Sequence, residues 1–333
     1  MCTERAGMST LTPPSFQDVL RARTVVQRYL PPTPLISRPA IDERLGFTAY
    51  FKCENMQPIG AFKIRGGLYL MSRLSDAERA RGVVTASTGN HGQSIAYAAR
   101  EFGVKAAIYA PEGANPGKVA AMKRLGAEVV LEGKDFDESR LAAEEHAVSE
   151  DMRFIHSANE PDLISGVGTY ALELLEAMPD LDTIIVPIGA GSGVCGTLTV
   201  AKAINPAIRV IGVQTTHLDV VYRSWKEKRL VTLDSGSTFA DGLATRVAFE
   251  LPMQIINEQI DDILLVSDDE LCEAIVLLLE DAHLVAEGAG AATTAAAMKL
   301  RTQLSGQKVA LIVSGGNITL DTLRWAIANG THD

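Results

Sequence analysis

One lysine, Lys63, has neighbours that are unusual for a surface charge. It lies in the stretch QPIGAFKIRGG (57–67), close behind Pro58, Gly60 and Phe62 and at the start of a helix-like run. A cation is poorly placed at the positive, N-terminal end of a helix. Partial desolvation would lower the pKa of the amine and free its lone pair for Schiff-base formation. Lys63 is therefore a candidate nucleophile, and an ordinary surface lysine is the alternative.

A glycine-rich loop offers a second kind of chemistry. It consists of Gly189, Ala190, Gly191, Ser192 and Gly193, with Gly196 beyond it. Free backbone N–H groups at a helix start suit a phosphate. A tight turn that needs glycine only for its dihedral angles is one alternative. The spacing G-x-G-x-x-G also fits a dinucleotide site, but the next strand ends in Gln214 instead of an acidic residue, so a nicotinamide-dependent oxidoreductase is only a distant alternative.

The stretch STGNHG supplies a third group of polar residues around glycine. Its members are Ser87, Thr88, Gly89, Asn90 and His91. Backbone donors at such a helix start can hold a substrate carboxylate, and the Asn90 amide can bind a phenolic or carbonyl oxygen. Capping of the helix by Ser87 or Thr88 is the alternative for this motif taken alone.

Short apolar runs alternate with amphipathic runs along the chain. The expected strands are 48–53, 82–86, 106–110, 127–131, 183–187, 209–214, 262–267 and 308–316. Strand and helix in alternation predict parallel sheets with helices on both faces. Three expected strands end in small-residue turns that precede helices, at 87–92, 188–193 and 314–321. Because ligands of such sheets bind beyond the carboxyl ends of the strands, we expect these turns to form one site.

Length and composition limit the kinds of partner. A chain of 333 residues exceeds one usual core, so two domains are expected. A net charge of −10 argues against nucleic acid or an anionic membrane and favours a small-molecule substrate. No run spans a bilayer and the start is no signal peptide, so we expect a cytoplasmic protein. Met8 is an alternative start. The cysteines are predicted to be reduced thiols: Cys2, Cys53, Cys195 and Cys272.

A reactive amine, a phosphate cradle and a carboxylate nest together suit an enzyme that uses pyridoxal 5′-phosphate on an amino acid. The motifs IGAFKIRGG, STGNHGQSIA, IGAGSG and VSGGN, in this order and at these separations, closely resemble the serine/threonine dehydratase and serine racemase family of fold-type II pyridoxal-phosphate enzymes. The resemblance extends from about Phe16 to Ala328.

The resemblance implies an α/β fold similar to the tryptophan synthase β subunit, with two domains of open, mostly parallel sheets and helices on both faces. Residues 1–81 and 160–333 would form a large cofactor-binding domain. Residues 82–159 would form a small, inserted and mobile domain that closes over the substrate. A homodimer is also implied.

Residue roles follow from the same resemblance. Lys63 would form the Schiff base with the cofactor, and Phe62 would adjoin the cofactor ring. Asn90 would contact the ring hydroxyl, residues 189–193 would bind the phosphate, and residues 87–91 would hold the substrate carboxylate.

Ser314 would face the pyridine nitrogen. A serine cannot keep that nitrogen protonated, so loss of a β-leaving group is favoured over transamination. Capping of the following helix is the alternative role for Ser314.

These roles predict a dehydratase, or ammonia-lyase, that converts threonine, serine or 3-hydroxyaspartate to a 2-oxo acid and ammonia. The candidate catalytic residues are Lys63, Ser87 and Thr88. Racemisation needs a second proton carrier opposite Lys63, and the Thr88 hydroxyl leaves a racemase open. A β-replacement synthase is a further alternative.

Two departures from the family pattern carry expectations. Gln214 and Val220 stand where cation-activated members have carboxylates, and Asp219 is one residue away, so we expect no required divalent metal. Because the sequence ends at Asp333, we also expect no regulatory domain of the biosynthetic threonine dehydratases and no feedback inhibition by isoleucine.

Overall fold

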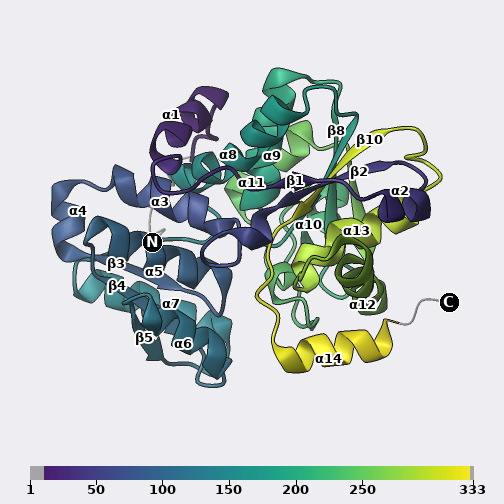
Figure 1. The fold of residues 1–333 in the computed structure, drawn as a ribbon. Helices are drawn as coiled ribbons and strands as arrows, with labels where there is room; N and C mark the ends of the chain where they lie inside the picture. Colours follow the sequence, from purple (N-terminus) through teal and green to yellow (C-terminus); the bar gives the residue numbers. More distant parts are fainter. Residues whose placement is uncertain (1–10, 331–333) are drawn as a thin grey trace.

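The computed structural model describes residues 11–330. Cys2 and the alternative start Met8 lie outside these residues. The described chain forms two separate sheets, which Figure 1 shows side by side with helices packed around each. The predicted α/β class with two open, mostly parallel sheets is confirmed.

The larger sheet has six strands in the spatial order β1-β2-β10-β7-β8-β9. The strands are β1 (Leu35–Ile36), β2 (Thr48–Cys53), β7 (Thr183–Pro187), β8 (Arg209–Thr215), β9 (Asp262–Val266) and β10 (Lys308–Val313). In this sheet β1 pairs with β2 in antiparallel orientation, and the other neighbouring strands are parallel. Val309 of β10 pairs with Ala49 of β2 and with Thr183 of β7, so the last strand of the chain lies in the middle of the sheet.

The smaller sheet has four parallel strands in the order β5-β4-β3-β6. They are β3 (Val83–Ala86), β4 (Ala106–Ala110), β5 (Glu128–Leu131) and β6 (Arg153–Phe154). All four lie inside the segment 82–159 that the sequence assigns to a small domain. The mobility of this segment stays a prediction.

Fourteen α-helices surround the two sheets within residues 11–330. They are α1 (Phe16–Val26), α2 (Pro39–Leu45), α3 (Lys63–Arg73), α4 (Asp76–Arg81), α5 (Asn90–Phe102), α6 (Pro116–Arg124), α7 (Phe136–Ser149), α8 (Pro161–Ala177), α9 (Ser192–Ile204), α10 (Val220–Glu227), α11 (Glu250–Gln259), α12 (Asp268–Leu277), α13 (Gly288–Leu300) and α14 (Leu320–Asn329). Helix α12 continues as a π-helical turn over Leu278–Ala282. None of the helices in this part of the chain combines the length and apolar character needed to cross a bilayer.

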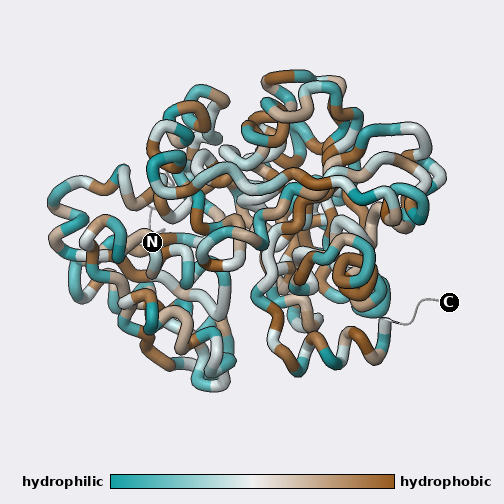
Figure 2. The backbone as a smooth tube through the Cα atoms, viewed as in Figure 1, coloured by the Kyte–Doolittle hydropathy of each residue, from teal (hydrophilic) through white to brown (hydrophobic). Residues whose placement is uncertain are grey.

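Each sheet is buried on both faces, which explains why its strands are almost entirely apolar. Alternate residues of a strand face opposite sides. Ile185 and Leu311 therefore pack in the core with α12 and α13, whereas Ile184 and Ile312 pack in the core with α8 and α9. Figure 2 shows these apolar segments inside the molecule.

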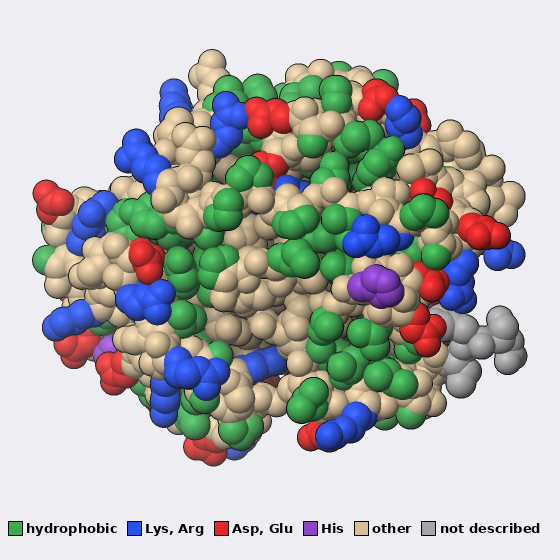
Figure 3. Space-filling model, in the orientation of Figure 1, with side chains coloured by type: hydrophobic (Ala, Val, Ile, Leu, Met, Phe, Trp, Pro, Cys, Tyr) green, Lys and Arg blue, Asp and Glu red, His purple; other side chains and the backbone are tan. Residues whose placement is uncertain are grey.

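The smaller sheet is divided in the same way. Val83 and Ile108 face the core that includes α5 and α3, and Val84 faces α7. On the outside, Figure 3 shows acidic and basic side chains interspersed over one face of the molecule.

Candidate active site

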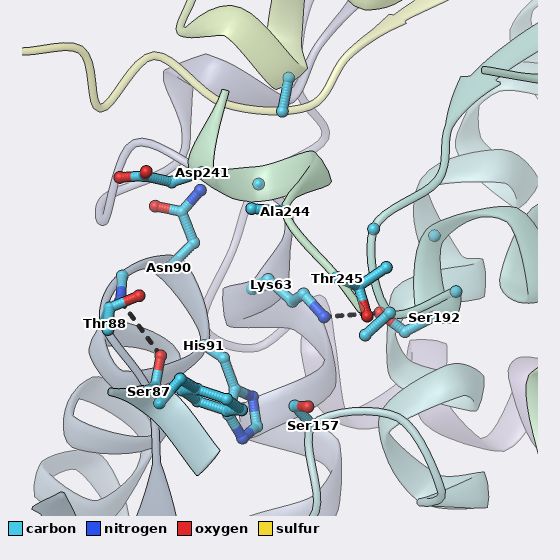
Figure 4. Close-up of a pocket in the computed structure, with 18 of the residues that line it drawn as sticks. Lys63, Ser87, Thr88, Asn90, His91, Ser157, Ser192, Asp241, Ala244 and Thr245 are labelled. Carbon is cyan, nitrogen blue, oxygen red and sulfur yellow. Dashed lines mark hydrogen bonds between the residues drawn. The ribbon is translucent and has the colours of Figure 1, made fainter. Parts of the chain in front are cut away.

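A cavity of about 550 Å³ lies between the carboxyl ends of the two sheets. It is lined by every residue that the sequence predicts for the site: Phe62, Lys63, Ser87, Thr88, Gly89, Asn90, His91, Gly189, Ala190, Gly191, Ser192, Gly193 and Ser314. The turns that follow β2, β3, β7 and β10 thus converge. Figure 4 shows Lys63 between the α5 start, with Ser87 to His91, and Ser192.

Lys63 is the first residue of α3, and its amine points toward the glycine loop. Its Nζ donates a hydrogen bond of 2.8 Å to Ser192 Oγ and lies 5.5 Å from the centre of the Phe62 ring. The described residues place no carboxylate against it, and burial lowers the pKa of this amine to about 8. The backbone fixes the position, because Phe62 N donates to Ser314 O. A substantial fraction of the amine is therefore neutral near pH 7 to 8.

The glycine loop fits a phosphate group. It leads from β7 into α9, and Gly191 has φ +104°, a left-handed conformation that favours glycine. A Cβ on Gly189 would lie 2.1 Å from Gly242 O. Within residues 11–330, no acceptor takes the N–H groups of Ser192 and Gly193. Free donors at the positive end of a 13-residue helix are able to bind an anion, and phosphate binding by this loop stays a prediction.

The start of α5 forms a second cradle. Ser87 Oγ accepts hydrogen bonds from Gly89 N at 3.2 Å and Gly92 N at 2.9 Å. The N-cap residue itself is Gly89, so Ser87 supports the helix start from two residues before the cap. The N–H groups of Thr88, Asn90 and His91 have no acceptor among the described residues. This arrangement can bind a carboxylate through backbone donors while the Ser87 side chain holds the turn.

The side chain of Asn90 is fixed by two partners from the other side of the cavity. Its Nδ2 donates to Glu287 Oε1 at 2.7 Å, and its Oδ1 accepts from Asn317 Nδ2 at 2.7 Å. Burial raises the pKa of Glu287, and the Asn90 hydrogen bond opposes this effect. One amide hydrogen of Asn90 is left for a ligand oxygen, as the predicted contact with the ring hydroxyl requires.

Ser314 directly follows β10 and faces the cavity. Its Oγ makes no hydrogen bond within the described chain, and Thr319 caps α14 by accepting from Thr322 N at 3.1 Å. The hydroxyl of Ser314 is thus free for a ligand, and the capping alternative is absent.

His91 is buried, and its ring has one defined tautomer. Its Nε2 lies 3.0 Å from Thr85 Oγ1, which itself donates to Ile155 O at 2.8 Å. The single hydroxyl proton of Thr85 is used there, so His91 Nε2–H must be the donor. Burial first, and the charges of Lys63 and His156 second, lower the pKa of His91 to about 3. The ring is neutral, and its buried Nδ1 has no partner in the described chain.

Several cavity residues were not predicted. His156 and Ser157 follow β6. A 3-10 turn before α11 and the residues after it supply five more: Asp241, Gly242, Ala244, Thr245 and Arg246. Strand β6 has only two residues, too short for an apolar run to reveal it or the turn behind it. Glu287 also lines the cavity, directly before α13, and the only sequence signal for it was an acidic residue next to Gly288.

Ion pairs join the helices of the smaller sheet to the opposite rim of the cavity. Lys118 of α6 pairs with Asp241, and Arg246 pairs with Asp137 and, at 3.4 Å, with Asp135. Each pair connects segment 82–159 to the rest of the chain.

Gln214 and Asp219, the residues compared with cation ligands, are each bonded to a neighbour in their own segment. Gln214 Oε1 accepts from Tyr222 N at 2.8 Å, and Asp219 pairs with Arg223 at 2.8 Å. Residues 11–330 contain no cluster of three His, Cys, Asp or Glu side chains suited to a metal. The independence from divalent metal stays a prediction.

Comparison with protein families matches residues 26–315 to the family described as pyridoxal-phosphate dependent enzyme. The chain belongs to this family. The resemblance predicted from four motifs is confirmed, and the chain is a lyase with pyridoxal phosphate as cofactor. The family match also decides against the nicotinamide-dependent alternative.

Individual relatives cover nearly the whole chain. It is 37% identical to the L-threonine ammonia-lyase of Thermotoga maritima, over 95% of this chain and 79% of the relative. It is 36% identical to the L-threo-3-hydroxyaspartate ammonia-lyase of Saccharomyces cerevisiae, over 96% and 98%. The solved structure of maize serine racemase superposes with a TM-score of 0.90 at 33% identity, over 95% and 98% of the two chains.

Proposed function

We propose that this lyase removes the β-hydroxyl and the amino group of a β-hydroxy amino acid, leaving a 2-oxo acid and ammonia. The observation that carries the proposal is the convergence of three features in one cavity. These are the Lys63 amine, the free N–H groups at the start of α9 and those at the start of α5. They suit, respectively, an aldehyde or a Cα–H group, a phosphate and a carboxylate.

Each residue then has a defined task. The N–H groups of Thr88, Asn90 and His91 bind the substrate carboxylate, and those of Ser192 and Gly193 bind the phosphate. When bound, pyridoxal phosphate supplies the electron sink that makes the Cα–H acidic. The neutral form of Lys63, available because its pKa is about 8, takes the α-proton.

The surroundings of the cofactor ring favour elimination. Ser314 has a free hydroxyl and no charge, so it offers the pyridine nitrogen a neutral partner. Asn90 binds the ring hydroxyl while Glu287 and Asn317 hold its amide in place. A weaker electron sink disfavours a long-lived carbanion, so prompt loss of the β-substituent is favoured over transamination.

The substrate is proposed to be L-threonine, L-serine or L-threo-3-hydroxyaspartate. The names of the relatives support threonine and 3-hydroxyaspartate, at 37% and 36% identity. The test is a screen for keto-acid release over hydroxy amino acids of both configurations, with purified holoenzyme. At least one L-isomer should release stoichiometric keto acid and ammonia. A holoenzyme that releases neither from any of them would contradict the proposal.

Racemisation is a second candidate activity, because Thr88 lines the cavity in the turn before α5, across from Lys63. The similarity to maize serine racemase supports it. Chiral analysis of recovered serine tests it directly. Thr88→Ala should abolish racemisation and spare keto-acid release. Loss of both activities together would instead assign Thr88 to substrate binding.

We further propose that segment 82–159 moves as a lid and that the enzyme is a cytoplasmic homodimer. The ion pairs Lys118–Asp241 and Arg246–Asp137 support the lid, since they join the segment to the opposite rim. Hydrogen exchange with and without substrate tests the lid, and light scattering tests the dimer. Cell fractionation tests the location.

A further inference from the structure

Two histidine rings line the cavity, and the hydrogen bonds around each ring fix which nitrogen carries the proton. One ring is left with a free acceptor and the other with a free donor. His91 donates its Nε2–H to Thr85 Oγ1 and leaves the lone pair of Nδ1 without a partner in the described chain. In His156 the two ring nitrogens have the reverse roles. Its Nδ1 accepts from Ala158 N at 2.9 Å and from Asn159 N at 3.0 Å, so the ring proton belongs to Nε2.

Both histidines come from the segment 82–159. His91 is on α5, His156 follows β6, and both line the cavity together with Lys63. Figure 4 shows the ring of His91 directed toward the space between Lys63 and Ser157, the residue next to His156. The His156 ring is held edge-on against Phe249, with ring centres 4.8 Å apart. His156 Nε2 has no acceptor within residues 11–330.

A hydroxyl group is complementary to this pair. Its O–H can donate to an imidazole lone pair while its oxygen accepts from an imidazole N–H. A buried acceptor without a partner is costly, so His91 Nδ1 favours a ligand that brings a donor. A halogen atom on the same carbon has no hydrogen to donate to this nitrogen.

We infer that His91 Nδ1 and His156 Nε2–H together recognise the β-hydroxyl group of the substrate, the first as acceptor and the second as donor. This inference rests on the proposed function and names the residues that distinguish a hydroxyl from another leaving group. Both rings stay neutral near neutral pH, so the free acceptor and the free donor are kept. Burial is the main cause that lowers the pKa of His91 to about 3 and of His156 to about 4.

Thr85 is a positioning residue in this arrangement. It touches no substrate, but its hydroxyl fixes which nitrogen of His91 carries the proton. Thr85, His91 and Ile155 all belong to the smaller sheet and its connections. His91 Nδ1 therefore keeps its position relative to the start of α5 if segment 82–159 moves.

The test compares L-serine with β-chloro-L-alanine, which yield the same products, pyruvate and ammonia, but differ in the leaving group. His91→Gln keeps a donor for Thr85 and removes the acceptor at Nδ1. His156→Asn keeps an acceptor for the N–H groups of Ala158 and Asn159 and removes the donor at Nε2. His217→Gln, an exposed residue outside the cavity, is the control.

Each cavity variant should lower kcat/KM for serine relative to chloroalanine by about 5- to 150-fold, the range for leaving one buried polar group unsatisfied. The control should leave this ratio unchanged. A ratio that stays unchanged in both cavity variants, even where both substrates lose activity equally, would overturn the inference. A wild-type holoenzyme inactive on every hydroxy amino acid and on chloroalanine would instead overturn the proposed function.

A measurement on the wild type keeps the inference testable if a variant does not fold. The measurement is an NMR spectrum of the protein with ¹⁵N-labelled histidine, in which backbone correlations assign each ring signal to its residue. The rings of His91 and His156 should both appear as neutral Nε2–H tautomers between pH 6 and 8. An Nδ1–H tautomer or an imidazolium at either position at pH 7 would overturn the inference.

Discussion

Lys63 Nζ lies 2.8 Å from Ser192 Oγ, so the amine that opens α3 touches the residue that opens α9. The two helix starts come from different strands of the same sheet, β2 and β7, on either side of β10. The Lys63 amine and the glycine loop are therefore held by one framework. With the roles proposed above, they would fix a bound cofactor at both of its ends.

Replacing Lys63 tests the nucleophile. Lys63→Ala should lose the visible absorption band of the bound cofactor and at least about 10²- to 10⁴-fold in turnover, the usual contribution of a general acid–base group. Lys123→Ala, at an exposed lysine of α6, should retain both. Borohydride reduction and peptide mapping should place the pyridoxyl group on the Lys63 peptide. Labelling of another lysine would contradict the assignment.

The pKa of Lys63 predicts a pH dependence for cofactor uptake. Only the neutral amine attacks an aldehyde, and burial lowers the pKa from 10.5 to about 8. The rate at which apoprotein gains its absorption band should thus rise about tenfold per pH unit below pH 8 and level off above it. Stopped-flow absorbance from pH 6 to 9.5 measures this. A rate that still rises tenfold between pH 8.5 and 9.5 would show an unshifted lysine.

Replacement of Gly189 tests the phosphate cradle. A Cβ there would meet Gly242 O at 2.1 Å, so Gly189→Ala must displace the loop and should raise the Kd for pyridoxal phosphate at least about tenfold. Gly113→Ala is the matched control, because its Cβ would meet nothing within 4 Å. Fluorescence titration of the apoproteins compares them. Equal Kd values would remove the loop from the binding site.

A buried charge cluster beneath the site predicts a loss of stability. Arg65, two residues after Lys63, is fully buried and bonds to Glu54 at 2.7 Å and to Glu173 at 2.7 Å. Lys52 completes the cluster through Glu173 at 2.6 Å. Arg65→Met leaves Glu54 buried without its partner and should lower the free energy of unfolding by about 3–5 kcal/mol.

Chemical denaturation measures this loss. Arg21, in an exposed pair with Asp18, gives the control, since Arg21→Ala should cost no more than about 1 kcal/mol. Similar costs for the two variants would mean that the buried cluster contributes no more than a surface pair.

The parts of the site that could be predicted are those with local sequence patterns. Glycine and hydroxyl residues mark the turns at 87–92 and 189–193 because close backbone approach and helix starts require them. The strands with long apolar runs were predicted almost to the residue, as for β2, β4 and β7.

The remaining contributors depend on contacts that no local pattern encodes. Glu287 lies 197 positions after Asn90, and nothing around either residue indicates the hydrogen bond between them. His156 follows a strand whose two residues are recognisable only through their pairing with β3. The tautomer of His91 likewise requires the position of Ile155, which only the folded sheet defines.

The central position of β10 has a consequence for how this protein is made. Because β10 separates β2 from β7, the larger sheet stays divided until nearly the whole chain has left the ribosome. The smaller sheet, whose strands are complete by Phe154, has no such delay. A stop codon shortly before Lys308 would therefore remove the centre of the larger sheet together with Ser314, and nascent chains should acquire protease resistance first in the smaller sheet.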